Sequence, residues 1–237
     1  MSDAPILLVE RLGRTGELVL NRPHRRNAVT GPLVDALHTG LDELIADDEI
    51  RVILIRGADG TFCAGNDLKE FRADPRPAWL ADHGDRWANF HAALFGCPKP
   101  IVGALEGHAI AAGSALALAC DFLIAGEEAQ LHVAEVALGL GPAPVNSVWL
   151  EWKFGAARAQ EFVVGGLPYT GRALANRGLA LRAVPDEDVV DEARALAERL
   201  AENDGASMAR AKALVRRLSG VPDAEAFRAR IELARQE

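Results

Sequence analysis

The first half of the chain alternates apolar runs with turn-forming residues, a pattern typical of strands joined by short loops. Two apolar runs, residues 18–20 and 51–55, end at turn signals. Between them, Thr30 and Pro32 mark the start of a helix, and apolar residues then recur at helical spacing through Ile45. Strand-helix-strand units normally place both strands parallel in one sheet, so the pattern predicts an α/β fold.

A second set of segments follows and then gives way to helices. The pattern predicts a buried strand at 100–105, a tight turn at 107–113, a small-residue helix at 114–120 and short strands at 122–124 and 130–133. From residue 148 onward it becomes helical, with amphipathic segments at 189–200, 206–218 and 224–235. We therefore expect one domain, with an α/β core over residues 1–185 and a helical region over residues 186–237 that mediates oligomerisation.

Composition narrows the classes of partner and compartment. Of 237 residues, 49% are hydrophobic and 25% charged, as in ordinary globular proteins. The net charge of −8 argues against a nucleic-acid partner, which demands a positive surface. The longest apolar run, residues 101–125, is broken by charged residues and so predicts no membrane span. Three unevenly spaced cysteines suit neither a disulfide framework nor a metal site, which favours a reducing cytoplasm.

Three short motifs occur in an order that resembles the crotonase superfamily, the enoyl-CoA hydratases and isomerases. They are NRPHRRNA at residues 21–28, FCAGNDL at 62–68 and GHAIAAG at 107–113. The resemblance implies a spiral of repeated β-β-α units and an acyl-CoA thioester substrate. Coenzyme A would then be part of the substrate rather than a separate cofactor. It also implies a homotrimer or a dimer of trimers.

Two of these motifs have the features of an oxyanion hole. Gly65 follows a strand, and a residue without Cβ lets the backbone approach a ligand closely. The third motif opens a helix, where unpaired N–H groups favour a developing anion. By resemblance the two donors are the backbone N–H groups of Asn66 and Ala112. Such donors typically contribute about 3–4 kcal/mol each to lowering a barrier.

The family offers two carboxylate positions near the reacting carbon, and this chain keeps one. Ala115 stands at the first position, and Glu135 stands at the second. Moving a double bond needs one proton-shuttling group, whereas adding water is helped by two, so a lone Glu135 favours isomerisation. A hydratase and a non-catalytic acyl-CoA-binding protein remain alternatives. Proton transfer near neutral pH requires an apolar pocket around Glu135, for which we expect Val133, Val136, Ala137, Leu138 and Leu140.

The remaining candidates belong to the coenzyme A site that the resemblance implies. Arg25 and Arg26 could form forked contacts with its phosphates, and Lys69 could reach the nucleotide phosphate. Ala64, Asp67 and Leu68 complete the predicted binding loop. For Asp67 we expect chiefly hydrogen bonds to the backbone of its own loop.

Overall fold

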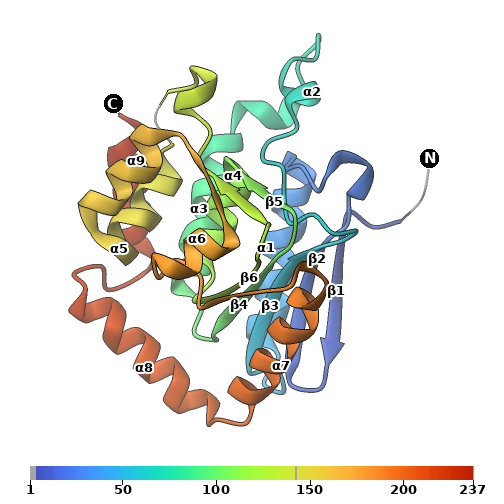
Figure 1. Cartoon of the computed structure of the whole chain (residues 1–237), viewed down its shortest axis with the longest axis vertical. Coiled ribbons are helices and arrows are strands. Elements are labelled where there is room, and N and C mark those ends of the chain that lie inside the picture. Colours follow the sequence, from blue (N-terminus) through green and yellow to red (C-terminus); the bar gives the residue numbers. More distant parts are fainter. Residues whose placement is uncertain (1–3, 142, 237) are drawn as a thin grey trace.

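The computed structural model describes residues 4–141 and 143–236 and contains two sheets in that part of the chain. The larger sheet has the order β1-β2-β3-β4-β6-β9, and the smaller has the order β5-β7-β8 (Figure 1). The strands are β1 (Leu7–Leu12), β2 (Thr15–Leu20), β3 (Val52–Gly57), β4 (Ile101–Leu105), β5 (His108–Ile110), β6 (Phe122–Gly126), β7 (Gln130–His132), β8 (Pro168–Thr170) and β9 (Arg182–Val184). The α-helices are α1 (Gly31–Ala46), α2 (Leu68–Phe71), α3 (His83–Gly96), α4 (Ala112–Ala119), α5 (Pro144–Gly165), α6 (Gly171–Asn176), α7 (Val189–Ala201), α8 (Gly205–Leu218) and α9 (Ala224–Arg235).

The first strand-helix-strand unit forms as the sequence predicts. Strand β2 pairs with β3 in parallel, and α1 connects them. The Thr30 hydroxyl caps α1 by accepting a hydrogen bond from the N–H of Leu33 at 3.4 Å. All other neighbours in the large sheet are also parallel except β1 and β2. The α/β class and the helical carboxyl-terminal region are therefore confirmed.

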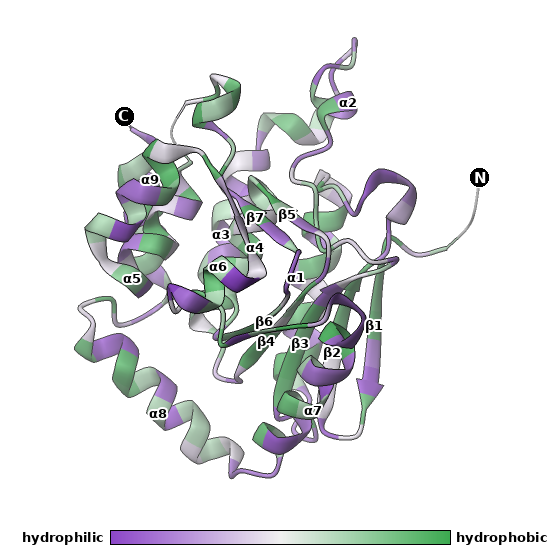
Figure 2. Ribbon diagram, in the orientation of Figure 1, coloured by the Kyte–Doolittle hydropathy of each residue, from purple (hydrophilic) through white to green (hydrophobic). Residues whose placement is uncertain are grey.

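Strand β3 shows why the large sheet needs helices on both faces. Its side chains alternate between two hydrophobic clusters, with Ile53 and Ile55 in one and Val52 and Leu54 in the other. All four are fully buried. The second cluster is closed by α7, whose apolar stripe includes Val189, Ala193 and Leu196. Figure 2 shows mostly hydrophobic residues along the central strands, whereas hydrophobic and hydrophilic residues alternate along α7 and α8.

The turn predicted at residues 107–113 is wrong in part, because it contains strand β5. That strand pairs with β7 from His108 opposite Gln130 to Ile110 opposite His132. Three residues carry too little periodicity to reveal a strand whose partner lies 22 residues further along the chain. The small-residue helix also begins earlier than predicted, at Ala112. The region after residue 148 is likewise not wholly helical, since it includes β8 and β9.

The three predicted carboxyl-terminal helices are confirmed as α7, α8 and α9. Helix α8 runs along the outside of the molecule, and α9 returns to pack beside α3 and α5 (Figure 1). Phe227 of α9 stacks on Phe95 with ring centroids 4.3 Å apart and tilts against Trp149 at 4.4 Å. Aromatic contacts of this kind hold the end of the chain against the core.

Gly113 sits where two backbones touch, and it yields a test of the fold. A Cβ at this position would lie 2.1 Å from the carbonyl oxygen of Cys63, whereas a Cβ at Gly165 would meet nothing within 4 Å. We expect Gly113→Ala to lower the free energy of unfolding by about 1–3 kcal/mol, as overpacking does. Gly165→Ala, the matched control, should change it little or raise it by up to about 1 kcal/mol. Urea unfolding checks both, and equal stability of the two variants would contradict the contact.

Candidate active site

The second and third sequence motifs meet through a short stretch of backbone pairing. The N–H of Cys63 donates to the carbonyl of His108 at 2.8 Å, and the N–H of Ile110 donates back to Cys63 at 3.0 Å. Gly65 follows with φ of 90°, and a Cβ there would lie 2.8 Å from the Ile110 carbonyl oxygen. Only glycine accommodates both this left-handed conformation and this close approach. The pairing therefore brings the segments that carry Asn66 and Ala112 side by side.

Asn66 and Ala112 line one cavity of about 180 Å³. Within residues 4–141 and 143–236, the backbone N–H of neither residue has an acceptor. Ala112 is the first residue of α4, where helix geometry leaves N–H groups unpaired. Ala111 before it has φ of 50° and ψ of −111°, a conformation that is costly for a residue with a Cβ. These two free donors are what an oxyanion hole requires.

Glu135 lines the same cavity, in front of the short 3-10 helix η3 (Val136–Leu138). Its Oε1 accepts a hydrogen bond from Asn146 Nδ2 at 3.3 Å. Its Oε2 is buried and has no hydrogen-bond partner among the described residues. Burial raises the pKa of Glu135 above its ordinary value, although a backbone hydrogen bond, His132 and Asn146 partly oppose this. A half-buried carboxyl with a raised pKa is suited to proton transfer.

The apolar pocket predicted around Glu135 is wrong in most of its members. Val136, Leu138 and Leu140 are 48%, 56% and 52% exposed, and Ala137 is exposed as well. Only Val133 of the predicted set is buried. These side chains are turned toward solvent, and the other residues of the described cavity lining come from other parts of the chain. The cavity is lined by Asn66, His83, Gly84, Trp87, Ala112, Glu135, Ala143, Pro144, Val145, Asn146 and Arg235.

Ala115, at the family's other carboxylate position, is fully buried within α4. It does not reach the described lining of the cavity, which holds no carboxylate other than Glu135. The remaining titratable side chains of that lining are His83 and Arg235. The site thus offers one carboxylate beside two free backbone donors.

Several predicted coenzyme A residues lie near this site on the surface. Arg25 and Arg26 are exposed, and the carbonyl of Arg26 accepts a hydrogen bond from the N–H of Ala64 at 3.0 Å. Leu68 and Lys69 are exposed in the first turn of α2. The first and second motifs are therefore adjacent at Arg26 and Ala64. That coenzyme A binds there stays a prediction.

Asp67 has its carboxylate engaged inside the protein. It is buried, lies 3.0 Å from the guanidinium of Arg22, and accepts hydrogen bonds from the N–H groups of Lys69 and Glu70. Burial tends to raise the pKa of Asp67, but Arg22 and the backbone hold it below its ordinary value. The side chain orders the loop that follows Asn66, in line with the backbone hydrogen bonds expected for it.

Sequence patterns did not reveal three polar residues around the cavity. His83 Nε2 lies 3.0 Å from Asn66 Oδ1 and so fixes the loop that carries one donor. Asn146 and Ser114 are buried and hydrogen-bonded to each other at 2.9 Å. The available signal was a polar residue within an apolar run: Ser114 among alanines and leucines, and Asn146 among valines and tryptophan.

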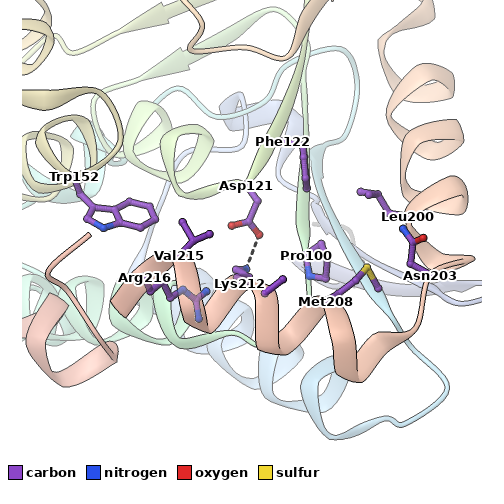
Figure 3. A pocket seen from close by; sticks show the side chains of 11 residues that line it. Pro100, Asp121, Phe122, Trp152, Leu200, Asn203, Met208, Lys212, Val215 and Arg216 are labelled. Atoms are coloured by element: carbon purple, nitrogen blue, oxygen red, sulfur yellow. Dashed lines mark hydrogen bonds and ion pairs between the residues drawn. The ribbon is translucent and has the colours of Figure 1, made fainter. Parts of the chain in front are cut away.

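A second hollow, of about 370 Å³, lies between α8 and the body of the molecule (Figure 3). Its wall is mostly apolar, and Figure 3 shows the Asp121 carboxylate paired with Lys212 across it. Lys212 also donates to the carbonyl of Lys99 at 2.9 Å. These charged groups are therefore already engaged, and no residue of the three sequence motifs is among those that line this hollow.

Among residues 4–141 and 143–236, no cluster of three or more histidine, cysteine, aspartate or glutamate side chains is arranged to hold a metal ion. No helix there combines the length and apolar character needed to cross a bilayer.

Known proteins share both the sequence pattern and the fold. Residues 14–236 match the family model for enoyl-CoA hydratase/isomerase. A probable enoyl-CoA hydratase from Rhizobium meliloti is 33% identical over 94% of this chain and 85% of its own length. A 2,3-dehydroadipyl-CoA hydratase from Escherichia coli is 32% identical over 89% of this chain and 81% of its own.

The solved structure of an enoyl-CoA hydratase from Bacillus anthracis superimposes with a TM-score of 0.85 at 25% identity. The match covers 98% of this chain and 90% of that one. The crotonase fold implied by the motifs is thereby confirmed. Fold, motif order and sequence identity together show that this chain belongs to the enoyl-CoA hydratase/isomerase family.

Proposed function

We propose that this chain is an enoyl-CoA isomerase that moves a carbon-carbon double bond into conjugation with a thioester. The observation that carries the proposal is the composition of the cavity. It combines two free backbone donors, at Asn66 and Ala112, with one carboxylate, Glu135. One proton-shuttling group is sufficient for isomerisation.

In the proposed reaction the thioester carbonyl oxygen accepts hydrogen bonds from the N–H groups of Asn66 and Ala112. Glu135 removes a proton from the carbon next to the carbonyl of a 3-enoyl-CoA, and the two electrons move into a dienolate. The donors stabilise the charge that develops on the oxygen. The protonated Glu135 then returns the proton to the far end of the dienolate, which gives the 2-enoyl-CoA and restores the carboxylate.

A hydratase is the second candidate, supported by the names of the relatives from Rhizobium meliloti and Escherichia coli. In that reaction Glu135 would act on a water molecule, without a second carboxylate at Ala115. The products separate the two, because isomerisation leaves the mass of the thioester unchanged and hydration adds one water. A non-catalytic binding protein fits less well, since it has no use for a buried carboxyl with a raised pKa.

Binding of the substrate is proposed to use the surface formed by the first two motifs. The phosphates of coenzyme A would contact Arg25, Arg26 and Lys69, while the loop of Ala64, Asp67 and Leu68 would shape the entrance. Assembly into a homotrimer or a dimer of trimers is part of the same proposal. Exposed apolar residues on α8, including Val215 at 61% and Leu218 at 77%, support such an assembly.

Removing both arginines tests the coenzyme A surface. We expect the Arg25→Ala, Arg26→Ala double variant to bind coenzyme A about tenfold more weakly, as the loss of charge-assisted contacts predicts. Its affinity should also depend less on salt than that of the wild type. Arg217→Ala, an exposed arginine on α8, is the control. Calorimetry at two salt concentrations measures both, and an unchanged salt dependence would remove the arginines from the site.

Glu135→Gln tests the proton shuttle. The amide keeps the size of the side chain but cannot take a proton at neutral pH. We expect isomerisation of a 3-enoyl-CoA to fall by at least about 10²-fold, with little change in acyl-CoA affinity. Glu128→Gln, which alters an exposed carboxylate on the surface, should keep wild-type turnover. Conjugation absorbance and product mass give the readout, and full activity of Glu135→Gln would refute the mechanism.

The raised pKa of Glu135 predicts an acidic limb in the pH profile. Burial stabilises the protonated carboxyl, so its proton is lost only above the ordinary value of 4.5. Because catalysis needs the carboxylate, kcat/KM should decrease as pH falls through this raised pKa. Burial lowers the pKa of His83, whose titration could produce a similar limb. If Glu135 produces the limb, the limb should stay at the same pH in the His83→Asn variant. A shift of the limb in that variant would assign it to His83 instead.

A further inference from the structure

Asn146 is a buried amide that touches both halves of the proposed reaction centre. It lies in the first turn of α5 and is 2% exposed. Its Nδ2 is 3.3 Å from Glu135 Oε1 and 3.2 Å from the carbonyl oxygen of Ala111. Ala111 is the residue whose unusual backbone conformation precedes the Ala112 donor. One side chain therefore bridges the carboxylate and the turn that carries the oxyanion hole.

The orientation of this amide is fixed by its neighbours. Glu135 Oε1 and the Ala111 carbonyl are both acceptors, so the NH2 group must face them. The opposite oxygen, Asn146 Oδ1, lies 2.9 Å from the hydroxyl of Ser114. That hydroxyl is fully buried and also lies 2.6 Å from the Ala111 carbonyl. A flipped amide would set its oxygen against two acceptors, which buried polar groups avoid.

This arrangement gives the two oxygens of Glu135 different surroundings. Oε1 is tied to Asn146, whereas Oε2 is buried without a partner in the described structure. Both hydrogens of the Asn146 amide are already used, so the amide has none left to hold a reacting water. Its effect is therefore on the carboxylate and the turn.

We propose that Asn146 is a positioning residue, which fixes the carboxylate of Glu135 relative to the Ala111–Ala112 turn while that carboxylate takes and returns the proton. The inference rests on the proposed function of Glu135. Ser114 supports this positioning, because its hydroxyl contacts the amide oxygen of Asn146 on the side away from Glu135. A misplacement of about 1 Å at a reacting group can reduce a rate by 10²-fold, so such a tie has a measurable effect.

Asn146→Leu is the principal test, because leucine has a similar volume and cannot form the hydrogen bonds. We expect kcat for the 3-enoyl-CoA to fall by about 10-fold to 100-fold, while KM changes by less than about threefold. Ser147→Ala is the matched control on the next residue of α5, where it removes only a hydrogen bond to the Ala143 carbonyl. It should keep wild-type kinetics.

The pH profile distinguishes positioning from simple packing. Asn146 stabilises the charged form of Glu135, so its removal should move the acidic limb to higher pH. The other titratable groups near this carboxyl are His132 on its own segment and His83 and Arg235 across the cavity, and all three remain in the variant. A fall in kcat with an unmoved limb would show a structural role only and overturn the proposal.

A double variant separates this inference from the proposed function. In a Glu135→Gln background, Asn146→Leu should change the residual turnover by less than about threefold, because the carboxylate that Asn146 positions is already absent. Additive losses would overturn the positioning role while leaving Glu135 as the shuttle. Full activity of Glu135→Gln alone would instead refute the proposed function. If Asn146→Leu fails to fold, Asn146→Ala replaces it in the same measurements, with the same outcomes deciding.

Discussion

Two backbone segments, separated by more than forty residues, meet at Cys63 through hydrogen bonds to His108 and Ile110. The contact is possible because Gly65 and Gly113 have no Cβ where the opposing carbonyl oxygens lie. The segments that carry the two backbone donors, Asn66 and Ala112, are brought together by this pairing. It places the loop of Asn66 beside the first turn of α4. Asn146 of α5 donates a hydrogen bond to the carbonyl of Ala111, just before that turn.

The chemistry of the cavity depends on opposing electrostatic demands. Free N–H groups favour negative charge on a substrate oxygen, while burial disfavours negative charge on Glu135. A carboxyl that resists ionisation is a stronger base once ionised, so the same burial that destabilises its charge suits it to accept a proton. Asn146 moderates this effect by donating to one oxygen of the carboxylate and leaving the other unpaired.

The wall of the cavity draws on elements that are distant along the chain. His83 and Trp87 come from α3, Val145 from α5 and Arg235 from the end of α9. Arg235 is held there by Asp85 at 2.5 Å. The packing of Phe227 against Phe95 and Trp149 thus connects the carboxyl-terminal helix to the site. Members of one fold family can differ in reaction through such contributions, which the fold itself does not fix.

The sequence by itself determined the features that depend on near neighbours in the chain. The Thr30 cap, the amphipathic stripe of α1 and the three carboxyl-terminal helices follow from local periodicity and hydrogen bonding. The three motifs also indicated the family and drew attention to Glu135, Asn66 and Ala112. The tertiary structure decided the rest, because burial and long-range pairing involve residues that no local pattern connects. Strand β5 exists through its pairing with β7, the residues that share the cavity with Glu135 come mostly from α3 and α5, and Asn146 gains its partners only when α5 packs against α4.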